Sequence, residues 1–405
     1  MNEYNSFQNL LVICNTFPDE SENYIGGIFI KDQLLNLSKF FTKIFVLVPA
    51  PLSISKVRKI PLNDYSLDNI HVHFIKYIDF PPSYFYFRDF WVRRETSKVL
   101  SFITKNNIHF ELIHAHNTWR AGRIAVELKK IFKCPVVLTE HTSNVLHAAA
   151  HRCDPQFEIT WKGCDAIIRV NSKDVHLFEK AHIPNERIHT IPNGFKKDLF
   201  YPMDTKTSKD RLGLPQNKKI LLSVGALVPT KGYSYMIRAL KEIIKVRKDV
   251  HYCIVGSGKL RKMLGKQVSE TDLQNYVTFI GGKPHNEIPL WMNACDLFVL
   301  PSLKESFGVV QIEALACGKP VVATRNGGSE EVITSDDYGL LVEPANPNDL
   351  AEKILMALDQ EWDREAILAY AERFTWERIA EEIICVYEDV LGKRERIQQI
   401  PIGNL

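Results

Sequence analysis

The stretch PSLKESFGVVQIEALACGKPVVAT, residues 301–324, carries the pattern from which the fold of the whole chain can be predicted. It follows the apolar run DLFVLP (Asp296–Pro301), continues as a predicted helix from Gly308 to about Ala316, and ends in the apolar run PVVAT (Pro320–Thr324). Continuous apolar strands separated by helices are typical of a parallel sheet that is covered on both faces. This segment therefore predicts an α/β architecture.

The same alternation of β-branched runs and amphipathic stretches extends over nearly all 405 residues. In the first half we expect helices at Ile28–Phe40 and Thr118–Phe132, and strands at Leu11–Cys14, Ile44–Val48, His71–Ile75, Glu111–Ala115, Pro135–Thr139 and Ala166–Val170. In the second half we expect further strands at Ile220–Val224, Val250–Val255 and Tyr276–Ile280. The pattern predicts two α/β domains. A typical domain has roughly 100–200 residues, so the length of the chain favours the same number.

The two halves are separated by a segment rich in Pro, Gly, Lys and Asp, Asn193–Gln216. We therefore predict an N-terminal Rossmann-like domain at 1–195, a linker at 196–216 and a C-terminal Rossmann-like domain at 217–375. Residues 376–405 are expected to form a helix that packs back on the N-terminal domain, followed by a tail. In open α/β sheets ligands bind beyond the carboxyl ends of the strands, so the loops after the strands should carry the chemistry.

Composition excludes several classes of function. A net charge of +3 is too small to indicate a nucleic-acid partner. The eight cysteines are scattered singly, several of them in apolar runs, which is typical of reduced core thiols. No run of about 18 apolar residues is present, and the N-terminal stretch lacks the pattern of a signal peptide. We expect a soluble cytoplasmic protein.

Two carboxylates, Glu305 and Glu313, flank the predicted helix start at Gly308. A helix N-terminus presents free N–H groups and a partial positive charge, which suits a phosphate. Carboxylates beside such an anion fit best as acceptors for sugar hydroxyl groups. The alternative is that both glutamates are solvated charges on a helix surface.

These motifs resemble the retaining glycosyltransferases of family 4, the group 1 or glycogen-synthase-like enzymes with the GT-B fold. The resemblance covers nearly the whole chain and is strongest from Leu221 to Leu350. It is carried by VGALVPTKG, IVGSGKL, FIGG, the stretch around ESFGVVQIE, NGGSEEVI and GLLVEP. It implies two Rossmann-like domains with a deep interdomain cleft and a nucleotide-sugar donor bound by the C-terminal half.

The resemblance also implies roles for residues of the C-terminal half. Glu305 would contact the donor sugar and Glu313 the ribose, while Lys231 would neutralise the diphosphate. Further donor contacts are expected from Ser306, Phe307, Gly308, Val309 and Val310, and from Gly281 and Lys283 near the nucleobase. The family usually has an arginine where this chain has Ala226. Either Lys231 acts alone with the helix start, or another basic residue substitutes, for which the candidates are Arg325, Arg261 and Lys259.

In the N-terminal half, Gly26 and Gly27 match a family loop that approaches the donor phosphate, although they could simply cap the following helix. His141 matches the family histidine that reaches the donor sugar, with a capping histidine as the alternative. His114 and His116 would be supporting or acceptor-side residues. Neither a cofactor nor an essential metal is expected, because the Asp-x-Asp motif is absent and His147, His151, Cys153 and Cys164 lack the Cys-x-x-Cys spacing of a metal site.

The segment Tyr77–Lys105 is aromatic and basic, which suits docking on an anionic membrane that presents a lipid-linked acceptor; a core-packed helix with a solvated basic face is the alternative. Taken together, the sequence and the resemblance predict a retaining, metal-independent hexosyltransferase. The donor would be a UDP-sugar, with a GDP-sugar as the alternative, and the acceptor a glycan or lipid in cell-envelope polysaccharide or glycolipid biosynthesis. A UDP-sugar epimerase of the same architecture and a non-catalytic nucleotide-sugar-binding protein are the competing hypotheses.

Overall fold

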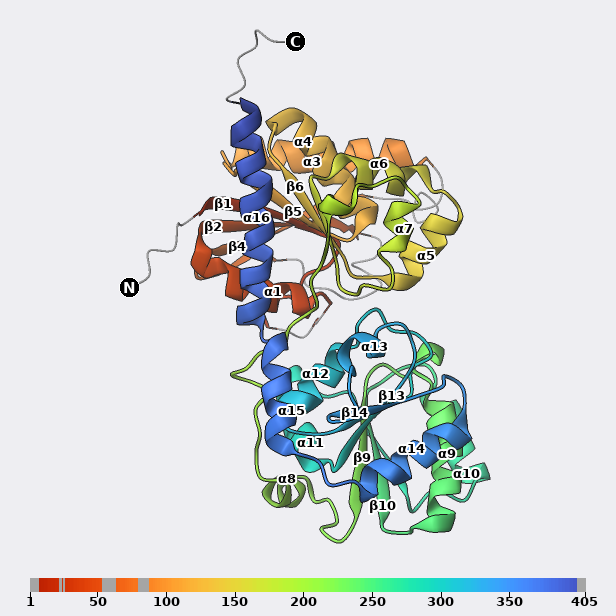
Figure 1. The fold of residues 1–405 in the computed structure, drawn as a ribbon. Coiled ribbons are helices and arrows are strands. Elements are labelled where there is room, and N and C mark those ends of the chain that lie inside the picture. The colour runs from red at the N-terminus through yellow and green to blue at the C-terminus, as the bar shows by residue number, and fades with distance from the viewer. Residues whose placement is uncertain (1–6, 22–23, 25, 53–62, 79–86, 399–405) are drawn as a thin grey trace. The chain divides into compact units, whose positions relative to one another are not determined.

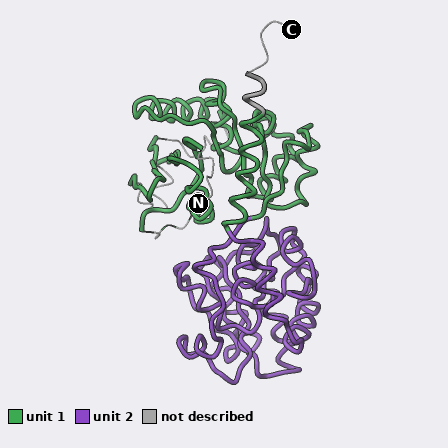
Figure 2. The backbone as a smooth tube through the Cα atoms, turned by 60° about the vertical axis from the view of Figure 1, so that its left-hand side comes forward, with its two compact units in different colours: residues 1–192, 376–405 green, residues 193–375 purple. Residues whose placement is uncertain are grey.

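The computed structural model describes residues 7–21, 24, 26–52, 63–78 and 87–398, with side chains up to Gly392 in the last helix. The chain divides into two compact units, which Figure 2 shows in green and purple. Unit 1 comprises residues 1–192 and 376–405, and unit 2 comprises residues 193–375. Both units are α/β with a mainly parallel sheet, which confirms the predicted fold class.

Unit 1 is built on an eight-stranded sheet in the order β3-β4-β2-β1-β5-β6-β7-β8 (Figure 1). Its strands are β1 (Phe7–Cys14), β2 (Phe41–Pro51), β3 (Tyr65–Leu67), β4 (Ile70–Tyr77), β5 (Leu112–His116), β6 (Val136–Glu140), β7 (Ala166–Arg169) and β8 (Ile188–Thr190). Its helices are α1 (Ile28–Leu37), α3 (Arg88–Lys105), α4 (Arg123–Phe132), α5 (Ser143–His151), α6 (Pro155–Gly163), α7 (His176–Glu179) and α16 (Trp376–Gln398). All neighbouring strands are parallel except β3, which runs antiparallel to β4.

The two faces of this sheet carry separate apolar cores, because successive side chains of a strand point to opposite faces. Leu10 and Val12 of β1 pack in one core, together with apolar residues of α1 and α16. Leu11 and Ile13 pack in the other, with apolar residues of α3, α4 and α6. The strand is apolar at every one of these positions because both of its faces are buried.

Unit 2 has a six-stranded, all-parallel sheet in the order β11-β10-β9-β12-β13-β14. Its strands are β9 (Lys219–Val224), β10 (Val250–Val255), β11 (Val277–Gly281), β12 (Leu297–Leu300), β13 (Val321–Thr324) and β14 (Gly339–Val342). Its helices are α8 (Thr205–Leu212), α9 (Tyr233–Val246), α10 (Arg261–Glu270), α11 (Ile288–Ala294), α12 (Val309–Ala316), α13 (Ser329–Val332), α14 (Pro347–Asp359) and α15 (Arg364–Ala371).

The structure differs from the predicted organisation at residues 196–216, which do not form a free linker. They belong to unit 2 and contain α8, which begins after Asp204, whose side chain accepts a hydrogen bond from the Thr207 N–H. The side chain of Lys209 is buried and forms an ion pair with Asp296 at 2.8 Å. A charged, Pro- and Gly-rich segment can thus be ordered when its charges find partners in the neighbouring core.

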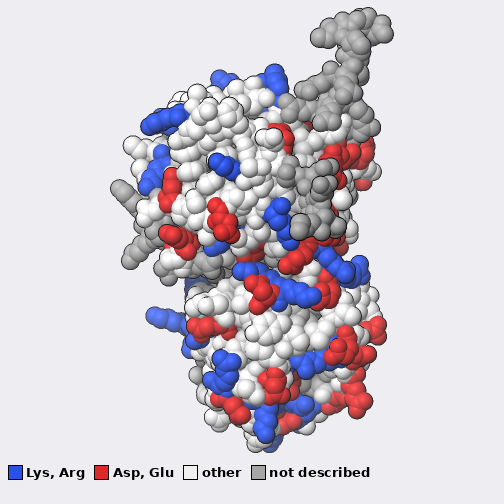
Figure 3. All heavy atoms as spheres, turned by 90° about the vertical axis from the view of Figure 1, so that its left-hand side faces the viewer, with Lys and Arg blue, Asp and Glu red and all other residues white. Residues whose placement is uncertain are grey.

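On the face shown in Figure 3, lysine and arginine side chains alternate with aspartate and glutamate. None of the described helices is long and apolar enough to cross a membrane. Six of the eight cysteines are buried, all except Cys153 and Cys385, and all eight are free thiols.

Candidate functional site

In the sheet of unit 2 the chain adds β10 and β11 on one side of β9, and then β12, β13 and β14 on its other side. The strands β9 and β12 are therefore adjacent in space although they are far apart in sequence. At such a switch point the loops after the two strands diverge and leave a crevice for a ligand. The loop after β9 carries Lys231 and the loop after β12 carries Glu305. Their side chains form an ion pair, with Lys231 Nζ at 2.5 Å from Glu305 Oε1. The structure therefore brings together the predicted phosphate cation and the predicted sugar acceptor.

The backbones of these two loops are in direct contact. The Leu303 N–H donates a hydrogen bond of 2.7 Å to the Thr230 carbonyl. Gly232 has a φ of 67°, and a Cβ atom there would lie 1.8 Å from the carbonyl oxygen of Pro301. Because only glycine tolerates both the conformation and the contact, this position fixes the approach of Lys231 to Glu305.

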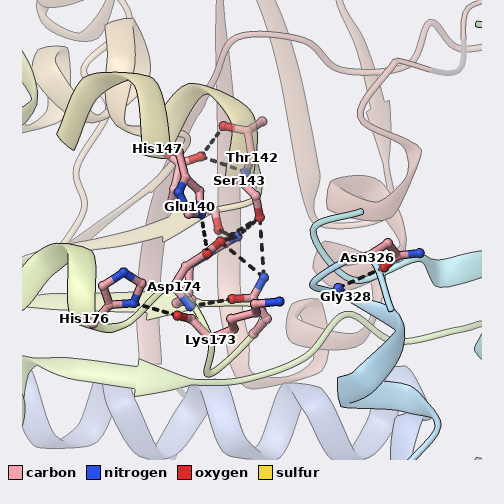
Figure 4. A network of polar contacts seen from close by, with 11 residues as sticks. Glu140, Thr142, Ser143, His147, Lys173, Asp174, His176, Asn326 and Gly328 are labelled. Carbon is pink, nitrogen blue, oxygen red and sulfur yellow. Dashed lines mark hydrogen bonds and ion pairs between the residues drawn. The ribbon is translucent and has the colours of Figure 1, made fainter. Parts of the chain in front are cut away.

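Helix α12 begins at Val309, directly after Gly308, whose φ is 82°, and no side chain caps its first N–H groups. The free N–H groups and the helix dipole together make this end of the helix suitable for an anion. The loop after β13 packs on the residues that precede α12, since a Cβ atom on Gly328 would lie 2.6 Å from the Phe307 nitrogen. That loop is held by Asn326, whose side-chain oxygen accepts a hydrogen bond of 3.0 Å from the Gly328 N–H (Figure 4).

Glu313 lies inside α12 and is almost fully buried, so it is not a solvated surface charge. Its Oε1 atom lies 3.1 Å from Nε2 of His285, which stacks on Phe200 with 5.3 Å between the ring centroids. Sequence reasoning did not single out His285. The one signal for it is its position four residues after Gly281, in the loop that follows β11.

Three other basic residues of unit 2 contact side chains outside the Lys231–Glu305 pair. Lys283 pairs with Glu287 at 3.0 Å, and Arg325 lies 3.4 Å from Glu343. The Arg261 guanidinium stacks on Phe279 at 3.9 Å from the ring centroid. The Lys231 side chain, by contrast, lies along the loop that contains Ala226, with its Cε 3.6 Å from where a Gly225 Cβ would be. Ala226 is exposed, as is Lys259.

In unit 1 the predicted residues gather at the end of β6 and the start of α1. Gly27, with a φ of 82°, precedes α1, and a Cβ atom there would lie 2.6 Å from the Thr16 carbonyl oxygen. Gly26 directly precedes it in the same turn. The ring of Phe29, in the first turn of α1, packs on His141 with 4.6 Å between centroids. The glycine loop and His141 are therefore neighbours.

Behind His141 lie the two histidines of β5. His116 is fully buried, and its Nδ1 lies 2.9 Å from Nε2 of His141. His114 is also fully buried, between Thr139 and Tyr387 of α16. Burial lowers the pKa of His114 to about 3, and burial together with the neighbouring histidines lowers that of His116 well below its ordinary value. Both are neutral near pH 7, and neither reaches the surface as an acceptor-side residue would.

The backbone of His141 is fixed by a polar network that the sequence did not predict (Figure 4). The buried Glu140 carboxylate accepts hydrogen bonds of 2.8 Å from the N–H groups of Thr118 and Thr142. The Glu140 carbonyl accepts a bond of 2.5 Å from Arg169, which has no exposed surface. A charged residue at the end of an otherwise apolar strand is the signal that could have identified both Glu140 and Arg169.

Arg169 also forms a buried ion pair with Asp174, at 2.6 Å. Although burial opposes the charge, hydrogen bonds from Ser143 and Arg169 hold the pKa of Asp174 well below its ordinary value. His147 lies against the same carboxylate, with its Nε2 2.7 Å from Asp174 Oδ1 (Figure 4). Asp174 is therefore the residue that ties the loops after β6 and β7 together.

No group of three or more His, Cys, Asp and Glu side chains within the described part of the chain is arranged to hold a metal ion. Of the four residues considered for such a group, His151 and Cys153 are exposed, Cys164 is buried in the core, and His147 is bound to Asp174.

Two family descriptions match the chain. Residues 204–374 match "Glycosyl transferases group 1" and residues 46–199 match "Glycosyltransferase Family 4". An uncharacterised glycosyltransferase of Methanocaldococcus jannaschii is 32% identical over 305 residues, which cover 71% of this chain and 79% of that protein. A D-inositol 3-phosphate glycosyltransferase of Thermobispora bispora is 29% identical over 320 residues, 73% of each chain.

Solved structures share the fold. Sucrose-phosphate synthase from Thermosynechococcus elongatus superposes with a TM-score of 0.75 at 22% identity, covering 95% of this chain and 100% of that one. The HepE protein of Anabaena in complex with UDP gives a TM-score of 0.70 at 23% identity, covering 94% and 100%.

Proposed function

The chain belongs to the group 1, family 4 glycosyltransferases, and from this premise we propose that it transfers a sugar from a UDP-sugar to a glycan or lipid-linked acceptor with retention of anomeric configuration. The observation that carries the proposal is the Lys231–Glu305 pair at the switch point of unit 2. A cation, a carboxylate and an uncapped helix start lie there on adjacent loops. In a nucleoside diphosphate sugar, the cation and the helix start suit the diphosphate, and the carboxylate suits the hydroxyl groups of the sugar.

The diphosphate would bind at the start of α12, where its charge is met by free N–H groups and by Lys231. Glu305 would then accept hydrogen bonds from hydroxyl groups of the sugar, and Glu313 from those of the ribose. Lys231 and the helix start also stabilise the negative charge that develops on the leaving diphosphate. We propose that the leaving phosphate oxygen takes the proton of the attacking acceptor hydroxyl, and that no metal ion is needed.

UDP is favoured as the nucleotide because the HepE structure was solved with UDP, although that resemblance concerns the fold. We further propose that the protein works at the cytoplasmic face of the cell membrane in the synthesis of envelope glycans. The support is the segment 77–105, of which residues 79–86 lie outside the described part of the chain. Within the rest of that segment, Phe87 and Phe90 expose 81% and 57% of their surface.

Thermal unfolding with a panel of nucleotide sugars tests the donor. A ligand at 100 times its dissociation constant adds about 2.7 kcal/mol to the free energy of unfolding, which is readily detected. We expect a UDP-sugar to stabilise the protein and, with an acceptor present, to be consumed. Interconversion of UDP-sugars without any acceptor would identify an epimerase instead, and stabilisation without turnover of any acceptor would identify a binding protein.

A further inference from the structure

Gln311, in the first turn of α12, is a polar residue with no exposed surface. Its side-chain nitrogen Nε2 lies 3.2 Å from the Phe307 carbonyl oxygen and 3.3 Å from that of Gly308. The backbone N–H of Gln311 also donates to the Gly308 carbonyl, at 2.9 Å. A Cβ atom on Gly308 would lie 2.4 Å from Nε2, so only glycine leaves room for this contact. Gln311 therefore holds the turn that leads into the helix.

The side-chain amide of Gln311 can hold this turn in only one orientation. With Nε2 toward the turn, its two N–H groups face two carbonyl oxygens, whereas the opposite orientation would set Oε1 against the same two oxygens. The Oε1 atom is buried and has no hydrogen-bond partner among the residues that the structure describes. Because an unpaired buried acceptor lowers stability, Gln311 stabilises the fold less than a fully paired amide would.

The two carbonyl groups that Gln311 holds also fix the direction of two N–H groups. In a planar trans peptide the C=O and the N–H that follows it point in opposite directions, and both peptide bonds here are trans. Since the Phe307 and Gly308 carbonyls face the Gln311 side chain, the N–H groups of Gly308 and Val309 point away from it and from the body of the helix. Neither N–H has an acceptor in the described part of the chain.

We propose that Gln311 is a positioning residue for the donor, which holds the Phe307–Gly308 turn so that the N–H groups of Gly308 and Val309 are aimed at the diphosphate before it binds. The inference rests on the proposed function, because it takes the start of α12 as the diphosphate site. Lys231 supplies a point charge there, which attracts an anion from many directions. The two fixed N–H groups add a direction, and they need no rearrangement when the ligand arrives.

Gln311→Met tests this role, because methionine has nearly the length of glutamine and no N–H group in its side chain. UDP and uridine differ by the diphosphate alone, so calorimetry with UDP and saturation-transfer NMR with uridine separate the two parts of the ligand. We expect the variant to bind UDP about fivefold or more weakly, with its uridine affinity changed less than about twofold. Its melting temperature should stay close to that of the wild type, because the unpaired Oε1 is removed as well.

A residue that only stabilises the fold would give a different result. The Gln311→Met variant would then melt at a clearly lower temperature and lose affinity for UDP and uridine together, and either that pattern or an unchanged UDP affinity would overturn the proposal. Gln311→Leu, which also lacks the donor, replaces the methionine variant if that protein does not fold. If neither apolar variant folds, Gln311 is a structural residue and the proposal is wrong.

Ser302→Ala is the matched control. Ser302 is also fully buried in the loop after β12, and its hydroxyl group has no partner within the described ranges. This change should alter UDP affinity less than about twofold, and a loss equal to that of Gln311→Met would contradict a specific role for Gln311. If the wild-type protein binds no UDP, the proposed function fails and this inference with it. If the wild type and a folded Gln311 variant bind UDP equally well, only the role of Gln311 fails.

Discussion

At the scale of single residues, the pairing of Lys231 with Glu305 has a direct consequence for donor binding. The two charges are largely withdrawn from solvent and neutralise each other at 2.5 Å. An incoming diphosphate must therefore compete with Glu305 for the same ammonium group. Removing the carboxylate frees the cation, so the two glutamates of the site should respond differently to substitution.

We predict that Glu313→Ala weakens UDP binding by about tenfold or more, as expected for a lost hydrogen bond to a charged group. Glu305→Ala should leave UDP affinity intact or raise it, because it releases Lys231, while abolishing sugar transfer. Calorimetric titration of both variants with UDP measures the difference. An equal loss of affinity in the two would contradict the assignment of one carboxylate to the ribose and the other to the sugar.

Lys231 should carry most of the diphosphate charge, since Ala226 provides none and Arg325 faces Glu343. Hydrogen bonds to charged groups contribute about 1.5–3 kcal/mol. Together with the lost charge, Lys231→Ala should reduce kcat/KM about a hundredfold or more, each ~1.36 kcal/mol being tenfold. Lys231→Arg should restore only part of this, because the two cations differ in shape and reach. Arg325→Ala is the control, and steady-state kinetics with varied donor should show less than a threefold change. The reverse ranking would identify Arg325 as the substitute cation.

At the scale of helices and strands, the sequence predicted the buried inner strands, including the four-residue β7, β12 and β13, and missed β3, β8 and β14. Both β3 and β8 have three residues, too few for a periodic pattern, and β14 is a four-residue edge strand. The helix α12 begins one residue after Gly308 and ends at Ala316, as the apolar pattern indicated. Continuous burial is visible in composition, whereas pairing at a sheet edge depends on the neighbouring strand.

The same distinction holds for the candidate site. Lys231, Glu305 and Gly308 could be found from motifs, because each lies in a loop of recognisable composition. The contact of His116 with His141 could not be found this way, because it depends on the register between β5 and β6. The charged strand ends Glu140 and Arg169 are visible in the sequence, but their polar network is not, since its partners come from three separate loops.

Helix α3 offers a test of membrane contact. Phe87 and Phe90 are exposed at its start, and Arg93 and Arg94 are exposed one turn later. Aromatic side chains beside basic ones suit the interface of an anionic bilayer. We predict that Phe90→Ser lowers binding to phosphatidylglycerol vesicles several-fold in sedimentation assays.

The matched control is Val246→Ser at the end of α9 in unit 2, where 72% of the side chain is exposed. This change should leave vesicle binding unaltered. Binding that is equally strong to neutral phosphatidylcholine vesicles, or unchanged in Phe90→Ser, would instead support an ordinary solvated helix.

At the scale of the whole molecule, two properties of the proposed reaction can be tested: the anomeric configuration of the product and the need for a metal ion. We predict that the product keeps the anomeric configuration of the donor and that EDTA does not abolish activity. EDTA should have little effect because Lys231 and the start of α12 would provide the positive charge that a metal ion would otherwise supply. Proton NMR of the fresh product measures the configuration. An inverted product, or activity lost with EDTA and restored by magnesium or manganese, would refute the mechanism.

The division of unit 1 into residues 1–192 and 376–405 has a consequence for folding during synthesis on the ribosome. The core that contains Leu10, Ile30 and Leu34 is completed by Trp376, Ile379 and Ile383 of α16. A ribosome adds about 5–20 residues per second, so the 183 residues of unit 2 delay that completion by roughly 10 to 40 s. Until α16 has been made, the apolar surface of unit 1 that it covers stays exposed on the nascent chain. A premature stop codon before Trp376 would make that state permanent, leaving one finished unit attached to one that cannot close.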